Sequence, residues 1–215
     1  MHVHTNLFLA SLMLTSAGSV SAASTADLRV IGSVIPSACT PLFAGGGVVD
    51  YGHIPAGSLS ATLHTALQTR NVSYSIICDA PIPIGISWVD DRLGSASIPG
   101  ETAFGLDNQG ANRIGLYTLR NAPRQMLGDG KSVDSITSFG YSGVWVLGSA
   151  NGDYFGQGAR NPIYSFAKQG NLTPTAYTTY SGAVSVTASI APTTTLDMTA
   201  PLILNGLSTM VVHYL

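Results

Sequence analysis

Charged side chains are scarce in this sequence of 215 residues. They make up 9% of the chain, against roughly a quarter of an ordinary soluble domain. The net charge of -2 and the pI of about 6.1 leave no basic field for a nucleic acid and no polybasic patch for anionic lipid. We therefore expect no nucleic-acid partner. Plentiful Gly, Ser, Thr, Val and Ile are typical of a β-rich protein.

Long apolar runs are lacking too. The apolar stretch from Leu7 to Leu14 is far shorter than the roughly 20 residues that span a bilayer, and no later segment reaches that length. We expect no membrane insertion. Small residues follow this stretch, so residues 1–22 are predicted to be a secretory signal peptide, although its start carries histidines in place of Lys or Arg. Cleavage after Ala22 or Ala23 would export the chain to the periplasm.

Cysteine is limited to Cys39 and Cys78. A single pair in an oxidising compartment predicts a disulfide, which would stabilise the fold by about 4 kcal/mol on the chain-entropy model. The alternative is a metal site, but His53, His64 and His213 do not stand at zinc-ligand spacing from either cysteine. We expect neither a metal nor a cofactor.

Catalytic motifs are lacking as well. The sequence GYSGV, from Gly140, has Val144 where a nucleophile elbow requires glycine. Asp90 and Asp91 would point to opposite faces of a strand, and we interpret them as a solvated turn. GLDNQG has neither the spacing nor the lysine of a phosphate-binding loop. The sequence therefore predicts a protein that is not an enzyme.

What the chain does contain is two-residue periodicity interrupted by Gly, Pro, Asn and Asp, which predicts short antiparallel strands. The predicted strands are 72–78, 82–89, 114–119, 141–146 and 184–190. Asn205-Gly206 favours a type I′ hairpin turn before a last strand, whereas 58–68 fits a helix or a strand. No repeat or linker divides the chain. We expect one all-β domain of two packed sheets.

The two ends carry the functional pattern. Near the N-terminus, Ala26, Leu28, Val30, Gly32 and Val34 would share one face of a strand, with a gap in the apolar row at the glycine. This run could be the first strand of the chain's own sheet. At the C-terminus, the side chains of Met210, Val212 and Tyr214 would share one face, and Val211, His213 and Leu215 the other. A terminal strand without a clearly polar face needs a covering partner.

These ends resemble those of chaperone–usher pilins. The run VIGSVIPSAC is similar to a pilin's N-terminal extension, and MVVHYL to its last strand, with an aromatic penultimate residue, here Tyr214. The stretches SIICDAP, SWVDDRLGSA and FGLDNQG resemble a poorly characterised family of β-fimbrial proteins. The resemblance implies an incomplete immunoglobulin-like β-sandwich that a donor strand completes, with one disulfide.

The resemblance also implies partners and roles. Residues 23–35 would be a donor-strand extension and 36–215 the β-sandwich domain. Leu28, Val30, Gly32 and Val34 would enter the groove of a neighbouring subunit, beside a strand formed by Met210, Val212, Tyr214 and Leu215. A periplasmic pilus chaperone would cover that groove first, and exchange at an outer-membrane usher would build a surface fimbria. Alternatives are an adhesin or adaptor that binds a host glycan or protein, with Trp88, Trp145, Tyr154 or Tyr164 at a shallow site, and a free periplasmic protein.

Overall fold

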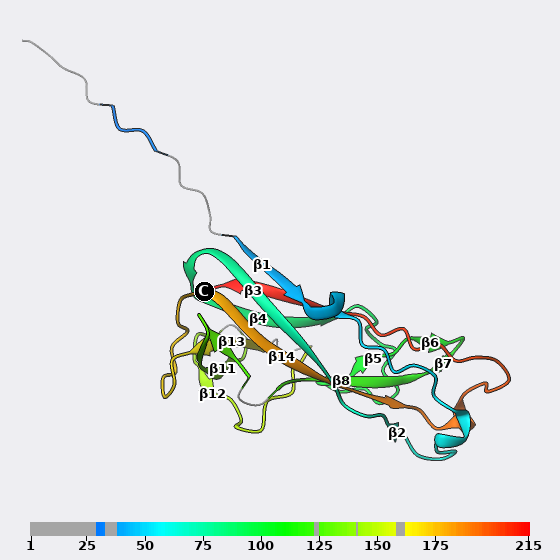
Figure 1. Ribbon diagram of the computed structural model, residues 1–215. Helices are drawn as coiled ribbons and strands as arrows, with labels where there is room; N and C mark the ends of the chain where they lie inside the picture. The colour runs from blue at the N-terminus through cyan, green and yellow to red at the C-terminus, as the bar shows by residue number, and fades with distance from the viewer. Residues whose placement is uncertain (1–28, 33–37, 123–124, 141, 158–161) are drawn as a thin grey trace, which may run out of the picture. The chain divides into compact units, whose positions relative to one another are not determined.

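The structure is a computed structural model, and it describes residues 29–32, 38–122, 125–140, 142–157 and 162–215. Contacts divide the chain into two units, Met1–Ile35 and Pro36–Leu215. The described part of the second unit is built from β-strands and contains three short 3-10 helices, η1 (Ala44–Gly47), η2 (Ala56–Ser58) and η3 (Thr193–Thr195). The all-β class predicted from the sequence is therefore confirmed (Figure 1).

The first sheet is built around two long strands, β3 (Arg70–Ile82) and β14 (Tyr177–Ile190), which pair antiparallel (Figure 1). This 8-stranded sheet has the strand order β1-β3-β14-β8-β5, with β2 and the β9–β10 pair beside β14. Its other members are β1 (Cys39–Phe43), β2 (Thr65–Ala66), β5 (Phe104–Gly105), β8 (Gly115–Asn121), β9 (Leu127–Gly128) and β10 (Lys131–Ser132). β1 thus forms one edge of the sheet.

The second sheet has five strands in the order β12-β11-β13-β4-β15. They are β4 (Ile84–Asp90), β11 (Asp134–Ser138), β12 (Val146–Leu147), β13 (Ile163–Ala167) and β15 (Ser208–Tyr214). A separate ribbon pairs β6 (Asn108–Gln109) with β7 (Asn112–Arg113). The last strand of the chain, β15, lies at an edge of the second sheet.

Side chains from both sheets form the hydrophobic core. Ile76 of β3, Ile86 of β4 and Phe166 of β13 are fully buried. Aromatic rings continue this core, with the Phe155 ring centroid 5.3 Å from that of Trp88 and 4.8 Å from that of Tyr164. Such pairs add stability beyond the apolar area that they bury.

Alternation along β14 agrees with the predicted strand. Val184, Val186, Ala188 and Ile190 are buried, whereas the serines and threonine between them are half-buried, as expected for a strand with one face on the core. The predicted strands 72–78 and 114–119 lie within or overlap β3 and β8. Residues 82–89 are divided at Pro83, which separates the end of β3 from the start of β4, because proline has no N–H to donate to a ladder.

Two local predictions are wrong, and one open alternative is resolved. Residues 142–145 form no strand, and only Val146 and Leu147 pair; the glycines around them favour bends. Of the two alternatives for residues 58–68, the structure has a strand, limited to Thr65–Ala66, and the only helical residue is Ser58 at the end of η2. The Asn205-Gly206 hairpin is absent, because residues 201–207 are not a strand and neither residue has a positive φ. A Cβ at Gly206 would lie 2.7 Å from the Tyr117 ring, so close packing accounts for the glycine.

Candidate functional site

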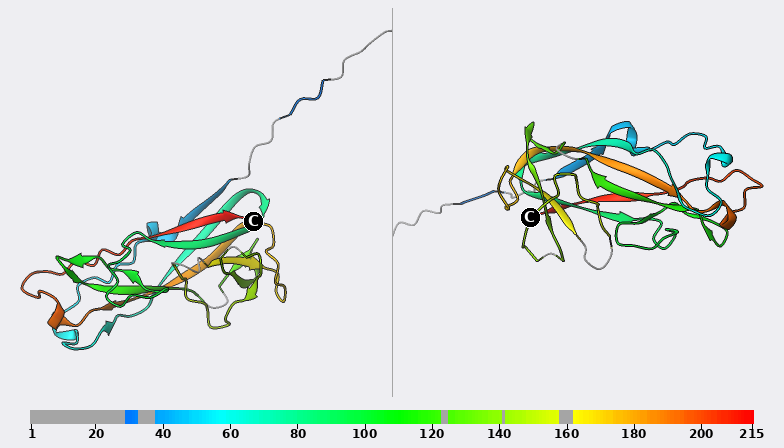
Figure 2. Two further views of the ribbon diagram at one scale, coloured as in Figure 1. Left: turned by 180° about the vertical axis from the view of Figure 1, so that it is seen from behind. Right: turned by 90° about the horizontal axis from the view of Figure 1, so that it is seen from below.

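The C-terminal strand β15 has one free edge. It pairs antiparallel with β4 from Ser208 opposite Asp90 to Tyr214 opposite Ile84, and no other described strand pairs with it. β1, the edge of the first sheet, runs close to β15 in each view (Figures 1 and 2). The Tyr214 hydroxyl accepts a hydrogen bond from the Cys39 N–H at 2.9 Å. Two unpaired sheet edges therefore lie next to each other.

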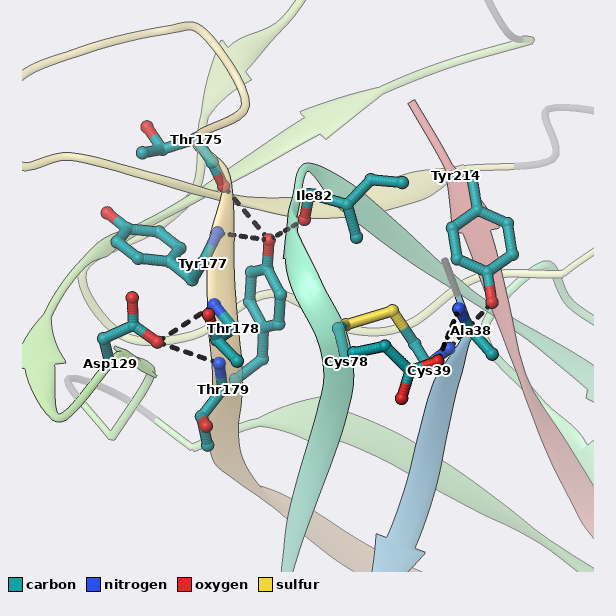
Figure 3. Close-up of a disulfide and its surroundings, with 12 residues drawn as sticks. Ala38, Cys39, Cys78, Ile82, Asp129, Thr175, Tyr177, Thr178, Thr179 and Tyr214 are labelled. Atoms are coloured by element: carbon teal, nitrogen blue, oxygen red, sulfur yellow. Dashed lines mark hydrogen bonds between the residues drawn. A yellow bond between two sulfur atoms is a disulfide. The ribbon is translucent and has the colours of Figure 1, made fainter. Parts of the chain in front are cut away.

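The predicted disulfide holds β1 in this place. Cys39 and Cys78 lie directly opposite each other in the β1–β3 pair, their Cα atoms are 4.0 Å apart, and their sulfur atoms are bonded (Figure 3). The Ala38 N–H donates to the Asp79 carboxylate at 3.3 Å just beside it. The disulfide therefore attaches β1 to the strand next to it.

An apolar groove of about 500 Å³ opens where β1 ends and β15 begins, and it is lined by Phe43 of β1 and Ser208 of β15. One wall is η1 with the chain on either side of it, and the other is the segment that leads into β15. The floor consists of side chains from the core. None of the described residues that line the groove is charged, and they are Phe43, Gly46, Gly47, Val48, Val49, Tyr51, Val72, Trp88, Leu106, Tyr117, Leu119, Val184, Val186, Ala188, Leu204, Asn205, Gly206, Leu207 and Ser208. Such a surface binds apolar groups.

Tyr51 fixes the first wall of the groove to the sheet. Its hydroxyl donates to the Val186 carbonyl and accepts from the Ala188 N–H, each at 3.1 Å. Burial raises the pKa of Tyr51, and burial also raises the pKa of Tyr117 on the floor. Both phenols thus stay neutral over the physiological range.

A polar network fixes the second wall. The buried Asp90 carboxylate accepts hydrogen bonds from the N–H groups of Arg92 and Gly105, each at 2.9 Å. Arg92 Nε donates to the Asn205 carbonyl at 3.0 Å, and Asn205 Nδ2 donates to Asp107 at 2.8 Å. The expectation of a solvated turn is wrong for Asp90, because these backbone donors compensate for its burial. It holds for the exposed Asp91.

The hydrogen bond from the Asn108 N–H, followed by that from Asn205, lowers the pKa of the Asp107 carboxyl. The Arg92 guanidinium, whose Nε lies 3.6 Å from Asp107 Oδ2, acts in the same direction. Asp107 is therefore charged, and it accepts the hydrogen bond that fixes Asn205 in the second wall of the groove.

The structure places the predicted strand residues as follows. Met210 is buried, Val212 is half-buried, and Tyr214 and Leu215 are exposed at 52% and 45%. Val30 is 88% exposed, and a Cβ at Gly32 would meet nothing within 4 Å. Leu28 and Val34 lie outside the described residues. The four predicted groove residues are thus described and belong to or follow the edge strand β15, but none of them lines the 500 Å³ groove, which meets this strand at Ser208. The donor run is described in part.

The aromatic and histidine candidates lie in different environments and do not form one site. Trp88 and Tyr164 are core residues with 6% and 3% exposure, whereas Tyr154 is 51% exposed. His213 Nε2 lies 2.8 Å from Ser87 Oγ, and His64 Nε2 lies 2.9 Å from Ser97 Oγ. Within the described residues, no group of three or more His, Cys, Asp or Glu side chains could hold a metal ion.

The sequence did not predict the wall around η1. Residues 43–51 have no two-residue periodicity, and their role depends on contacts with β14, which is far along the chain. The glycines at 45–47, all with positive φ, were the available indication, since they mark a tight turn. In the part of the chain that the structure describes, none of the helices has the length and apolarity to cross a membrane.

These features define a class: an all-β protein of two main sheets with a disulfide between neighbouring strands and an apolar groove at the start of its last strand. The family described as "Protein of unknown function (DUF1120)" matches residues 28–141, and the chain belongs to this family. The chain is similar to Protein GltF of Escherichia coli (strain K12), with 29% identity over 224 residues that cover 88% of each protein. It is also similar to Uncharacterized protein YhcF of the same organism, with 30% identity over 122 residues, 54% of this chain and 48% of YhcF.

Proposed function

We propose that the chain is a structural subunit of a surface fimbria, and that its groove accepts the N-terminal strand of a neighbouring subunit. The observation that carries this proposal is the unpaired edge of β15 together with the apolar groove at the start of that strand. In this arrangement, the fold is an incomplete immunoglobulin-like sandwich, and the incoming strand would lie between β15 and β1.

Strand addition explains both the acceptor, which is an unpaired strand edge with an apolar groove, and the donor, which is the N-terminal run. An added strand gains main-chain hydrogen bonds along the free edge, and its alternate side chains fill apolar pockets. Leu28, Val30 and Val34 supply such side chains in one phase, and Gly32 lets the backbone come close at one position. The exposed side chain of Val30 is available to a neighbour.

A vacant groove next to an unpaired edge is prone to aggregation. Exported subunits of this kind therefore need cover before they assemble. We propose that a periplasmic pilus chaperone supplies a temporary strand, and that exchange for the next subunit's strand takes place at an outer-membrane usher. The neighbouring fimbrial subunits are the lasting partners.

Deletion of Ala26–Val34 tests the donor half of the proposal. The deleted chain should form a complex with its chaperone in amounts equal to the full chain, because its groove is intact. It should fail to polymerise, because it has no strand to offer. Native gels of periplasmic extracts measure both results. A deleted chain that still polymerises would disprove the proposal.

Removal of Val212–Leu215 tests the acceptor half. The shortened β15 loses its pairs with the start of β4, so the capture of the chain by the chaperone and its periplasmic abundance should both fall. Leu172→Ala, an exposed position away from the groove, is the control. Unchanged abundance after the truncation would contradict a chaperone-dependent subunit.

A further inference from the structure

The neighbouring edges of β1 and β15 present different main-chain groups, although each strand has one side without a partner among the described strands. In an antiparallel ladder, the N–H and C=O groups of one residue point to the partner strand, and those of the next residue point away from it. The hydrogen bonds on the paired side of a strand therefore identify the groups on its free side. These groups decide whether the edge can hold another strand.

On β15, the residues with odd numbers face β4. The Leu215 N–H donates to the Pro83 carbonyl just after the strand, and the Asp91 N–H donates to the Leu207 carbonyl just before it, each at 3.1 Å. The residues whose main-chain groups point to the free edge are therefore Ser208, Met210, Val212 and Tyr214. None of these four is a proline, so each of them has both an N–H and a C=O on this edge.

On β1, the residues with even numbers face β3. The Asp79 N–H donates to the Ala38 carbonyl at 3.1 Å just before the strand. The main-chain groups on the free edge are therefore those of Cys39, Pro41 and Phe43. Pro41 has no N–H, and a strand tolerates proline where its nitrogen faces away from the paired side. The centre of the β1 edge thus has an acceptor but no donor.

The Tyr214 hydroxyl occupies a second donor of the β1 edge. It accepts the Cys39 N–H at 2.9 Å (Figure 3), and the disulfide attaches Cys39 to β3. This contact joins the last residue of β15 to the first residue of β1. Of the three residues on the β1 edge, Phe43 is then the one whose N–H is left for an added strand.

We propose that β15 is the edge that pairs with the incoming strand, and that β1 is a protected edge, which Pro41 and the Tyr214 hydroxyl keep from forming a ladder. The inference rests on the proposed function, because the occupant is the N-terminal run of a second copy of this chain. The added strand bonds to β15 from Ser208 to Val212, and it meets β1 through side chains.

A single pairing edge limits the ways in which two subunits can join. Two open edges side by side would each be a template for another chain, and proline is a usual means of blocking such an edge. The side chains of Met210 and Val212 pack on the core. A strand that pairs with β15 therefore brings its own alternate side chains to the same core, which is how strand addition gains specificity.

The test is amide hydrogen exchange measured by NMR on the ¹⁵N-labelled chain, isolated as a monomer by size-exclusion chromatography, with and without a saturating synthetic peptide of residues 26–34. The peptide should slow exchange at Met210 and Val212 about tenfold or more, because their N–H groups gain acceptors. Exchange at Phe43, which reports on β1, should change less than about twofold.

The outcomes separate this inference from the proposed function. Slowing at Phe43 equal to that at Met210 would show a ladder on both edges, and it would overturn the protected edge while strand addition stands. Absence of saturable peptide binding would overturn strand addition, and the inference with it. The same conclusion would follow if exchange at Met210 and Val212 in the monomer were already as slow as at the β4-facing amides of β15.

Tyr214→Phe tests the cap on Cys39, because it keeps the ring and removes the hydroxyl. Exchange at the Cys39 N–H of the monomer should become about tenfold faster or more, since this group loses its acceptor. Tyr154→Phe, which removes the hydroxyl of an exposed ring outside both strands, is the matched control and should leave Cys39 unchanged. Equal exchange at Cys39 in Tyr214→Phe and in the control would refute the cap.

The double variant Pro41→Ala, Tyr214→Phe gives the β1 edge both of its missing donors. It should bind the peptide about tenfold more tightly than the parent chain, because the peptide gains hydrogen bonds on its second side. Exchange at Phe43 should now slow with the peptide, as it does at Met210. The amide spectrum shows whether the variant is folded. A folded variant whose affinity for the peptide does not exceed that of the parent would show that these two residues do not protect β1.

Discussion

At the scale of single residues, the adjacent aspartates Asp90 and Asp91 contribute differently to stability. Asp90 is 5% exposed and accepts two backbone N–H bonds, whereas Asp91 is exposed and accepts from the Thr209 hydroxyl at 2.8 Å. A buried donor that loses its acceptor costs about 1–3 kcal/mol, whereas exposed bonds contribute little. The burial of each carboxylate, and not its residue type, therefore determines how much it contributes to the free energy of unfolding.

Asp90→Ala should therefore lower the free energy of unfolding by about 2–4 kcal/mol, because the N–H groups of Arg92 and Gly105 lose their acceptor. Asp91→Ala is the matched control and should cost less than about 0.5 kcal/mol. Urea unfolding of the two variants measures the difference. Equal losses of unfolding free energy would show that the buried hydrogen bonds of Asp90 stabilise the fold no more than the exposed bond of Asp91.

His213 gives the stability of the protein a dependence on pH. Burial lowers its pKa from the ordinary value of 6.5, so the unfolded chain binds the proton more readily than the folded one. Stability from the neutral imidazole is full above about pH 6.5 and is lost as the pH falls through the lower folded value.

Acidification from pH 7.5 to pH 5 should therefore destabilise the parent more than His213→Gln, which cannot titrate. Urea unfolding at both pH values gives the difference for each protein, and the carboxylates that the two proteins share cancel in the comparison. The same pH dependence in parent and variant would exclude a contribution from His213.

At the scale of elements, β1 depends on a single neighbour. Among the described strands it pairs with β3 alone, and the disulfide joins the two at Cys39 and Cys78. This bond closes a loop with a sequence separation of 39. Without the bond, β1 would be held to β3 by the ladder from Cys39 to Phe43 alone.

The double variant Cys39→Ser, Cys78→Ser should lose about 4 kcal/mol of unfolding free energy. It should also bind a peptide of residues 26–34 more weakly, because β1 is held less firmly beside the groove when only its ladder with β3 remains. Denaturation and peptide titration measure the two effects. A variant with unchanged affinity for the peptide would show that β1 is no part of the binding edge.

The sequence predicted strands best where one face packs on the core, as in β14 and in the last strand. It predicted poorly where contacts distant in sequence decide the structure. Residues 141–146 contain strand-forming side chains, yet the described residues 142–145 bend. Gly206 indicated a turn, and packing against Tyr117 explains it instead. Of the groove, periodicity indicated β15 and the Trp88 strand, whereas the wall at Val48 and Tyr51 had no pattern.

At the scale of the whole molecule, the proposed subunit is both donor and acceptor. Its groove is empty of any strand from its own described residues, and its N-terminal run has apolar side chains in one phase. A chain that carried its own donor strand at the C-terminus could fill the groove by itself. In such a self-complemented chain, filling of the groove no longer requires a second subunit, so its effect on folding can be measured without assembly.

We therefore predict that appending a second copy of residues 26–35 to the C-terminus, through a short Gly/Ser linker, raises the Tm. The linked strand has an effective concentration in the millimolar range, so it should fill the groove and block polymerisation. The control appends the same segment with Leu28, Val30 and Val34 of the copy replaced by serine, which keeps the backbone and removes the apolar side chains.

Thermal unfolding and size-exclusion chromatography distinguish the outcomes. A higher Tm and a monomeric chain for the apolar copy alone would support strand addition through side-chain pockets. If both appended segments raise the Tm equally, the linker or the added mass would be responsible. The apolar side chains of the donor run would then not be the cause of the stabilisation. If neither does, the groove does not accept this strand, and the proposed assembly fails at its central step.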